Sequence, residues 1–269
     1  MHIVVCVKQV PDTANVHINP ETNTLIREGV ESIMNPYDEY ALEEALKLKD
    51  EHNARVTVVT MGPPQADIVL RDALARGADD AVLLTDRAVA GADTLATSYI
   101  LSLAIRKLNA KPDLVFFGKQ AIDGDTAQVG PGVSELLNYP LVTYVKSLTV
   151  KDGVFNAETV MDEGVDVLEG KLPAVMTVVK EASTPRFTSL AGWINAKESE
   201  IPVWGAKELE ADMDRCGLDG SPTKVVRIFP PAVKSGGTKI DGREAPDDAV
   251  KAIIRLLKPD NHRVSTVGA

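Results

Sequence analysis

The sequence is poor in aromatic residues and in cysteine, and it contains no long hydrophobic run. Phe, Trp and Tyr together make up 4% of the 269 residues, so a platform for stacking nucleic acid bases is not expected. The two cysteines, Cys6 and Cys216, cannot build a disulfide framework, and the sequence has no CxxC pair for zinc. No apolar run approaches the roughly 18 residues that indicate a membrane span.

Positive charge is outweighed by negative charge, with 29 Lys and Arg against 39 Asp and Glu, and the formal net charge is -10. An acidic chain without basic stripes is not expected to bind a phosphate backbone. The chain is 44% hydrophobic, which is ordinary for a globular protein, and its length fits one large domain or two small ones. It starts directly with a strand-like segment at 1–7 and lacks the apolar core of a signal peptide. We therefore expect a soluble, cytoplasmic protein with no nucleic acid partner and no direct membrane insertion.

Short apolar runs alternate with helical stretches in the first half of the chain. Continuous apolar runs predict buried strands at 3–7, 56–60, 81–84 and 114–117. Helices are predicted to begin at Pro36, with Asn35 as cap and Asp38 favouring the helix dipole, and near 64, 93 and 125. Gly77 is the predicted stop of the second helix. This alternation predicts a parallel α/β sheet.

Ligands of such sheets bind beyond the carboxyl ends of the strands. The loops at 8–13, 61–63 and 118–125 follow predicted strands, and 118–130 is the densest polar segment of this half. It leads into a helix, whose free N–H groups suit a phosphate. Gly124 and Asp125 also have a simpler interpretation, as a turn residue and a helix cap. The motifs GxGxxG and GxxxxGK[ST] are absent, so any nucleotide is held by a less common arrangement.

The pattern changes after residue 140. Strand-like segments at 142–150, 154–160, 165–168 and 174–179 have no helix between them, which predicts an antiparallel addition to the parallel core. Leu190 and Trp193 either pack internally or form an exposed partner contact. The segment 217–244, rich in Gly, Pro, Ser and Lys, predicts an extended C-terminal arm around a second subunit or, more simply, a flexible tail. A last helix is predicted over 245–257.

Catalytic and metal-binding patterns are missing. The four histidines have no metal-ligand spacing, and no Ser-His-Asp set or pair of catalytic acids is evident. Cys6 lies in a predicted buried strand and is expected to be a packing residue rather than a nucleophile. The residues alone thus predict a nucleotide-binding α/β protein without catalytic residues or metal ligands of its own.

Six segments, in this order, resemble the β subunit of electron transfer flavoproteins. The match covers at least 1–200, and the segments are VCVKQVPDT (5–13), MNPYDEYALEEALKLK (34–49), VVTMGP (58–63), LRDALARGADDAVLL (70–84), FFGKQAIDGDTAQVGP (116–131) and LEGKLPAVMTV (168–178). The resemblance implies an adenine-nucleotide-hydrolase-like (Rossmann-like) core in 1–200, with a partner-recognition loop at about 180–200. It also implies a C-terminal arm and helix in 201–269 that contact a larger, FAD-holding α subunit.

The resemblance further implies that the strand-end loops hold a nucleotide. The matching cofactor-binding positions, including 93–97, which resembles the electron-bifurcating members, are Cys6, Asn35, Pro36, Tyr37, Asp38, Met61, Asp93, Thr94, Thr97, Gly118, Lys119, Gln120, Ala121, Ile122, Asp123, Gly124, Asp125, Thr126, Ala127, Gln128 and Val129.

Leu190 matches a leucine with which the family anchors into an acyl-CoA dehydrogenase. Two features of this loop, one that affects its shape and one that affects its charge, depart from the family pattern. Ala191 stands where the family often has proline, and the usual basic run is reduced to Lys197 beside Glu198 and Glu200.

The identity of the nucleotide depends on the type of member. Ordinary β subunits hold AMP, whereas in electron-bifurcating members the same pocket holds a second FAD that accepts a hydride from NADH. The segment AIDGDTAQVGP (121–131) resembles the bifurcating type. Gly124 removes a side chain where a longer nucleotide must pass, and Thr126 can bond a pyrophosphate. The resemblance therefore implies FAD as cofactor, NAD as substrate, and ferredoxin or flavodoxin and an acyl-CoA or related dehydrogenase as electron-accepting partners.

Three alternatives stay open. One is an AMP-holding subunit that carries electrons from acyl-CoA dehydrogenases, and another is a membrane-quinone-linked nitrogen-fixation type of the same family. The third is a stand-alone nucleotide sensor of the universal-stress type, which shares the fold. A sensor predicts a Gly-rich ATP loop that ends in Ser or Thr, of which the sequence has no clear version, and it leaves the long C-terminal extension without a role.

Overall fold

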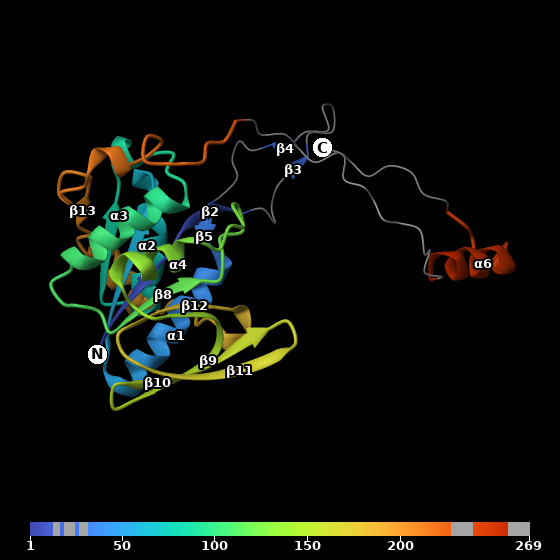
Figure 1. Cartoon of the computed structure of the whole chain (residues 1–269), viewed down its shortest axis with the longest axis horizontal. Helices are drawn as coiled ribbons and strands as arrows, with labels where there is room; N and C mark the ends of the chain where they lie inside the picture. The colour runs from blue at the N-terminus through green and yellow to red at the C-terminus, as the bar shows by residue number, and fades with distance from the viewer. Residues whose placement is uncertain (13–16, 19–24, 27–31, 227–238, 258–269) are drawn as a thin grey trace. The chain divides into compact units, whose positions relative to one another are not determined.

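The computed structural model of the chain describes residues 1–12, 17–18, 25–26, 32–226 and 239–257. Its contacts divide the chain into a first unit, Met1–Val226, and a second unit, Arg227–Ala269. The first unit is built around a large sheet with the strand order β11-β10-β9-β12-β8-β1-β6-β7-β13 (Figure 1).

All strands of this sheet except β10 and β11 run parallel to one another, as the alternating pattern predicts. Their bounds are β1 His2–Cys6, β6 Arg55–Met61, β7 Asp80–Leu84, β8 Leu114–Gly118, β9 Leu141–Lys151, β12 Ala174–Val178 and β13 Val203–Trp204. The α/β fold class with a mostly parallel sheet is thereby confirmed.

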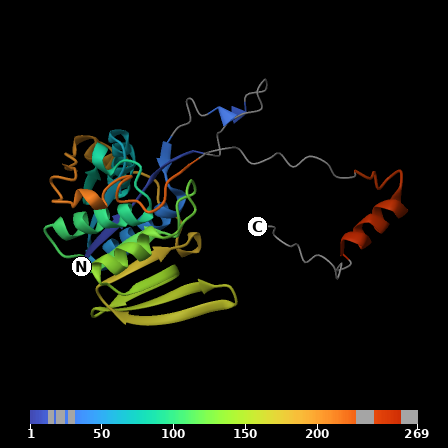
Figure 2. The ribbon, with the colours of Figure 1, turned by 45° about the horizontal axis from the view of Figure 1, so that its top comes forward.

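The predicted antiparallel addition is present but smaller than expected. β10 (Val154–Met161) runs antiparallel to β9, and β11 (Gly164–Lys171) runs antiparallel to β10. These strands form the lower edge of the sheet in Figure 2. β12 does not belong to the addition, because it lies between β8 and β9 and is parallel to both. Every residue of β12 is buried, as is usual for a parallel strand covered on both faces.

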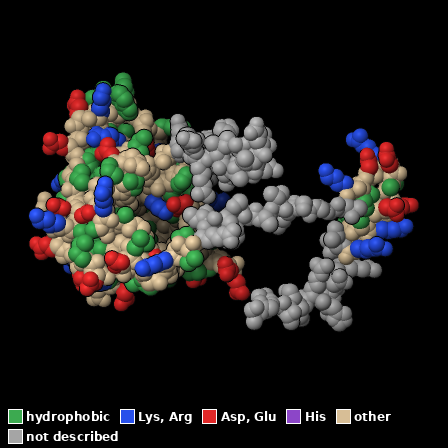
Figure 3. Space-filling model, turned by 90° about the horizontal axis from the view of Figure 1, so that it is seen from above, with side chains coloured by type: hydrophobic (Ala, Val, Ile, Leu, Met, Phe, Trp, Pro, Cys, Tyr) green, Lys and Arg blue, Asp and Glu red, His purple; other side chains and the backbone are tan. Residues whose placement is uncertain are grey.

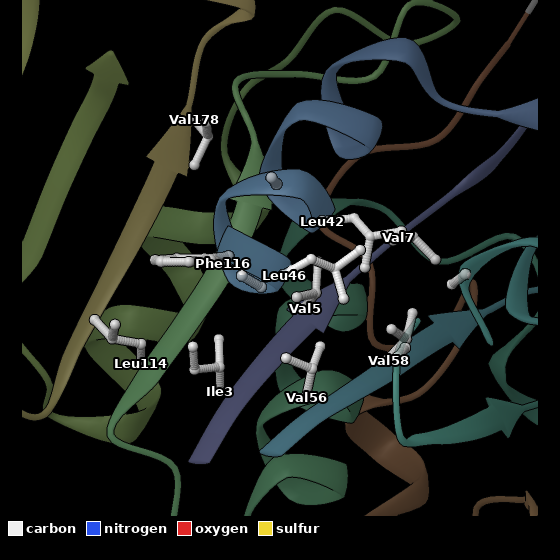
Figure 4. Packing of buried hydrophobic residues seen from close by; sticks show 14 of the residues in the cluster. Ile3, Val5, Val7, Leu42, Leu46, Val56, Val58, Leu114, Phe116 and Val178 are labelled. Atoms are coloured by element: carbon white, nitrogen blue, oxygen red, sulfur yellow. The ribbon is translucent and has the colours of Figure 1, made fainter. Parts of the chain in front are cut away.

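Helices cover both faces of the sheet. α1 (Pro36–His52) and α2 (Asp67–Arg76) pack on one face, and α3 (Thr94–Lys107) and α4 (Val129–Leu137) pack on the other. The alternation of side chains along β1 serves both layers. Ile3 and Val5 lie with Leu42 and Leu46 of α1 (Figure 4), while Val4 packs in the cluster of the opposite face.

Helix starts follow the sequence predictions except for α4. A 3-10 turn at Pro64–Ala66 leads into α2, which Gly77 ends, and Asp93 caps α3. α4 starts at Val129 rather than near 125. The reason is that Asp125 and Ala127 both have a φ of 55°. This left-handed backbone cannot continue into a right-handed helix.

The connection between β1 and α1 contains two small antiparallel pairs. β2 (Gln9–Pro11) pairs with β5 (Ser32–Met34), and β3 (His17–Ile18) pairs with β4 (Leu25–Ile26).

α5 (Leu190–Glu198) packs against α2 in the first unit. A Cβ on Gly192 would lie 2.1 Å from the carbonyl oxygen of Ala75, so only glycine allows these two helices to approach so closely.

The second unit contains α6 (Pro246–Leu257), close to the predicted 245–257. Val250, Ile253 and Ile254 of α6 are exposed, and Figure 3 shows charges of both signs on this helix. Residues 227–238 of the predicted arm lie outside the described residues, so the arm and the division at 200 stay predictions. Within the described part of the chain, no helix is long and apolar enough to cross a membrane.

Candidate functional site

A cavity of about 1120 Å³ lies at the carboxyl ends of four adjacent strands, β8, β1, β6 and β7. The loops that follow these strands line it, together with the start of α3 and with Thr223. Because neighbouring strands lie roughly 4.8 Å apart, the four strand ends span about 14 Å. This is the edge at which open α/β sheets bind their ligands.

The part of the cavity next to β1 and β8, called the near end here, is organised by a buried carboxylate. Asp38, in the first turn of α1, is 6% exposed. Its Oδ2 accepts a hydrogen bond from the backbone N–H of Lys8 at 2.7 Å, and its Oδ1 accepts one from Gly118 at 3.1 Å. The carboxylate thus fastens the loop after β1 to the end of β8, which is a more specific role than the predicted interaction with the helix dipole.

Burial raises the pKa of Asp38 to about 7, although hydrogen bonds from Asn35, Lys8 and Gly118 oppose the rise. Burial and the nearby Asp38 carboxylate also raise the pKa of the Cys6 thiol. Cys6 is 5% exposed, as predicted, and lines the cavity as a neutral side chain rather than as a thiolate.

Asn35 occupies the cap position of α1, but its side chain makes no capping hydrogen bond, contrary to the prediction. Its Nδ2 donates to the carbonyl oxygen of Gln120 at 2.8 Å, and its Oδ1 accepts from the N–H of Ile122 at 3.1 Å. The side chain therefore fixes the loop after β8 instead of the helix terminus.

Gly118 is required where β8 meets α1. A Cβ at this position would lie 2.3 Å from Oδ1 of Asp38 and 2.7 Å from the backbone nitrogen of the same residue. Gly124, six residues further on, has no such constraint, since a Cβ there would meet nothing within 4 Å.

Charged side chains hold the rest of this loop. Lys8 Nζ lies 2.7 Å and 2.8 Å from the two carboxylate oxygens of Asp123, which joins the loops after β1 and β8. Gln120 donates to Asp125, and Lys119 lies over the ring of Tyr144 at 5.4 Å. The loop is therefore tied to its surroundings at several points.

The other part of the cavity, called the far end here, is lined by the loop from β7 to α3, by the start of α3 and by Thr223. Its lining residues in this region are Thr85, Asp86, Arg87, 89–94, Thr97 and Thr223. Asp93 caps α3, because its Oδ1 accepts hydrogen bonds from the N–H groups of Leu95 at 2.9 Å and Ala96 at 3.2 Å. Burial opposes the shift, but hydrogen bonds from Thr223, Ala96 and Leu95 lower the pKa of Asp93. Its carboxylate therefore carries a charge at neutral pH.

Most of the predicted cofactor-binding residues line this one cavity. The lining includes Cys6, Asn35, Asp38, Met61, Asp93, Thr94, Thr97, Gly118, Lys119, Gln120, Ala121, Gly124, Thr126, Ala127, Gln128 and Val129. Pro36, Tyr37, Ile122, Asp123 and Asp125 are not part of the lining, although Ile122 and Asp123 hold the loop in place through Asn35 and Lys8.

Sequence reasoning missed the loop after β7 and Thr223. Thr85, Asp86 and Arg87 line the cavity, and the strand-end rule already applied to the other loops points to them, because a strand was predicted at 81–84. Thr223 carries no comparable signal, since it lies 130 residues from its partner Asp93. Among the described residues, no group of three or more His, Cys, Asp or Glu side chains is placed to hold a metal ion.

A second surface surrounds Leu190 at the start of α5. Leu190 is 77% exposed, Trp193 is 56% exposed and Phe187 is almost fully exposed, so the alternative in which Leu190 and Trp193 pack internally is wrong. Arg186 anchors the preceding segment to α1. Its guanidinium contacts Glu43 and Asp50, each at 2.9 Å, and its backbone N–H donates to Glu43 at 3.0 Å.

The sequence profile of the electron transfer flavoprotein domain matches residues 22–209. Three similar proteins cover nearly the whole chain. The electron transfer flavoprotein subunit beta of Clostridium acetobutylicum is 49% identical over 262 residues, which is 97% of this chain and 100% of that protein.

The caffeyl-CoA reductase-Etf complex subunit CarD of Acetobacterium woodii is 48% identical over 257 residues, which is 95% of this chain and 98% of that protein. Protein FixA of Azorhizobium caulinodans is 47% identical over 268 residues, which is 96% of this chain and 95% of that protein.

Proposed function

The chain belongs to the electron transfer flavoprotein family, and from this premise we propose that it is a β subunit that binds FAD and takes part in electron bifurcation. The observation that carries the proposal is the extent of the cavity, which reaches across four strand ends with about 1120 Å³. Ligand pockets commonly measure about 300 to 1000 Å³, so this one is large for a mononucleotide and suits a dinucleotide.

The chemistry of the lining fits the two phosphates of FAD. The lining includes three cationic residues, Lys8, Arg87 and Lys119, and cationic donors form strong hydrogen bonds to phosphate. Thr94, Thr97, Thr126 and Gln128 add neutral hydrogen-bonding groups. We assign these residues to the phosphates and the ribityl chain, and the surroundings of Asn35 and Asp38 to the adenosine.

Bound FAD supplies the redox chemistry, namely acceptance of a hydride from NADH and release of its two electrons singly, one to ferredoxin or flavodoxin and one towards a partner dehydrogenase. The task of this chain is to hold the cofactor and exclude competing groups. Cys6 contributes an uncharged thiol to the wall, and the backbone of 118–129 supplies fixed dipoles. This division of labour explains why no catalytic residue is assigned.

We propose an electron transfer flavoprotein α subunit as the constant partner and an acyl-CoA or related dehydrogenase as a second one, in the cytoplasm. The names of the relatives support this, because one is called a subunit beta and another belongs to a reductase-Etf complex. Leu190, on the exposed apolar surface of α5, is the proposed contact with the dehydrogenase.

Nucleotide extraction from the heterodimer, produced with its α subunit, tests the cofactor. Two FAD per heterodimer, together with NADH oxidation that requires ferredoxin or flavodoxin, is the expected result. One FAD and one AMP would instead assign the chain to the electron carriers that do not bifurcate.

The docking proposal is tested separately with Leu190→Ala. Removing this exposed side chain is expected to slow electron exchange with the dehydrogenase by about tenfold or more, as for a central interface residue. Nucleotide content should stay unchanged. The control is Met213→Ala, which removes a different exposed apolar side chain, 55% exposed, outside α5. Equal rates for the two variants would contradict the assignment of Leu190.

A further inference from the structure

A segment near the end of the first unit reaches the far end of the cavity. Thr223 lines the cavity, and both its backbone N–H and its hydroxyl donate to Oδ2 of Asp93, at 3.0 Å and 2.9 Å. These two bonds connect positions that are far apart in the chain. They make the C-terminal part of the unit a wall of the cavity.

The carboxylate of Asp93 has no hydrogen-bonding capacity left for a ligand. An ionised carboxylate has about four lone-pair sites. Oδ1 already accepts two hydrogen bonds, from Leu95 and Ala96, and Oδ2 accepts the two from Thr223. Asp93 therefore acts on a bound molecule through Thr223 and the start of α3, and not by contact through its own oxygens.

Further contacts hold the segment 217–223 on the loop 88–93. The N–H of Asp93 donates to Ser221 Oγ at 2.8 Å, and that hydroxyl donates to the carbonyl oxygen of Gly217 at 2.6 Å. Leu218 lies so close to Gly91 that a Cβ on Gly91 would be 2.9 Å from Leu218 Cγ. The segment and the loop are thus packed together along the cavity rim.

We infer that Asp93 is a positioning residue that fastens the segment 217–223 as a wall of the cavity, and that this wall is needed to retain FAD but not AMP. The inference rests on the proposed function. Of the positions matched to a nucleotide, 35–38 and 118–125 belong to the start of α1 and the loop after β8, and the hydrogen bonds of their side chains join them to each other and to Lys8 rather than to Asp93 or Thr223. A mononucleotide seated on them stays clear of Thr223, whereas a dinucleotide that extends across the roughly 14 Å of strand ends meets it.

Asp93→Asn is the decisive variant because it separates two roles of the carboxylate. Asparagine caps helices as well as aspartate does, so α3 keeps its cap. The amide nitrogen, however, then faces the two donors of Thr223, and the attachment of the segment is lost. Thr223→Val removes one of the two bonds, and Thr223→Ser keeps both. Asp212→Asn is the control, since Asp212 caps a 3-10 turn away from the cavity lining.

The measurement is the FAD and AMP content and affinity of the full-length heterodimer, produced with its α subunit. Asp93→Asn should lower the FAD content from two to about one per heterodimer and weaken FAD binding at this cavity by about tenfold or more, since hydrogen bonds to a charged group are lost. AMP affinity should not change. Thr223→Val should show a smaller loss, and Thr223→Ser and Asp212→Asn should match the unsubstituted protein.

Two results would overturn the inference. One is two FAD in both the unsubstituted protein and Asp93→Asn, and the other is an equal loss of FAD and AMP affinity, which indicates general loosening of the fold. Should Asp93→Asn not assemble with the α subunit, Thr223→Val decides, because it leaves the helix cap untouched. One FAD and one AMP in the unsubstituted protein would overturn the proposed function instead, so the two failures are distinguishable.

Discussion

The two ends of the cavity are built from different kinds of contact. At the near end, the buried Asp38 and Asn35 bond to backbone groups of the loops after β1 and β8, within the hydrophobic core of the sheet. At the far end, the partly exposed Asp93 holds the segment 217–223, near the end of the first unit, by its hydrogen bonds to Thr223. The near end is held by buried groups next to the core of the sheet, whereas the far end is held by contacts between the loop before α3 and a segment distant in sequence.

This difference has an energetic consequence. A polar group buried at the near end costs free energy whenever its partner is removed, because water cannot replace the partner. Groups at the far end are nearer to solvent, so the loss of a partner there changes the shape of the wall more than the stability of the fold. We therefore expect variants at the buried positions of the near end to change stability, and variants of the contact between Asp93 and Thr223 to change ligand choice.

The largest effect is expected for Gly118→Ala. The added Cβ would lie 2.3 Å from Asp38 Oδ1, and both β8 and α1 are too firmly packed to move without cost. We expect a loss of about 3 kcal/mol in unfolding free energy, at the upper end for an overpacked core, and loss of the bound nucleotide. Urea unfolding followed by circular dichroism measures it. A loss below about 1 kcal/mol would show that the near end is not rigid.

Asp38→Asn should have the next largest effect, with a characteristic pH dependence. Because burial raises the pKa of folded Asp38 from 3.8 to about 7, the folded protein keeps a proton that the unfolded chain has released within this range. The stability contributed by Asp38 therefore falls as pH rises from about 4 to 7, by up to roughly 1.4 kcal/mol per pH unit.

Asparagine does not titrate, so the stability difference between the unsubstituted protein and Asp38→Asn should shrink as pH rises. Unfolding curves at about pH 5 and about pH 7.5 measure this difference. Asp93→Asn serves as the contrasting variant. Hydrogen bonds lower the pKa of Asp93, so its contribution is present at neutral pH and is lost as pH falls through the acidic range. Parallel profiles for the two variants would remove the distinction between the ends.

Lys8→Met should change stability by less than about 1 kcal/mol, because the ion pair between Lys8 and Asp123 is partly exposed and screened. Nucleotide release should become faster, since the variant opens the link between the loops after β1 and β8 and removes a cation from the cavity. Lys49→Met, which breaks a pair with Asp79 outside the cavity lining, is the matched control. Equal release rates in both variants would assign Lys8 no role in retention.

Gly124→Ala should have the smallest effect on the fold, within about 0.5 kcal/mol, because a Cβ there meets no atom within 4 Å. If Gly124 leaves room for a longer nucleotide, as the sequence suggests, FAD content falls while AMP affinity stays the same. Comparison with Gly118→Ala distinguishes a glycine that is required for folding from one that is required only for ligand binding. An unchanged FAD content would remove Gly124 from the site.

The sequence predicts the parallel core well, because continuous apolar runs and helix caps are local signals. The strands at β1, β6, β7 and β8 and the starts of α1, α2 and α3 follow from them. The parallel position of β12 could not be predicted. Its neighbours β8 and β9 are distant in sequence, and no local sequence signal in β12 indicates whether it runs parallel or antiparallel to them.

The candidate site, too, could be predicted only in its local features. The strand-end rule finds the loops, but it does not show what their side chains bond to. Asn35 has the residue type of a helix cap, yet its partners lie more than 80 residues away. The pair of Asp93 and Thr223 is similarly non-local, so the far wall could be recognised only in the folded protein.

α1 connects the cavity with the surface around Leu190. Its first turn carries Asp38, and one to three turns later Glu43 and Asp50 hold Arg186. A helix of 17 residues is a rigid rod of about 25 Å. The contacts of Asp38 and Glu43 therefore fix both the distance between these residues and their relative orientation about the helix axis. One residue inserted between Asp38 and Glu43 turns the rest of the helix by about 100° and directs Glu43 away from Arg186. Natural variation in the length of this helix should accordingly occur after Asp50, where neither attachment is affected.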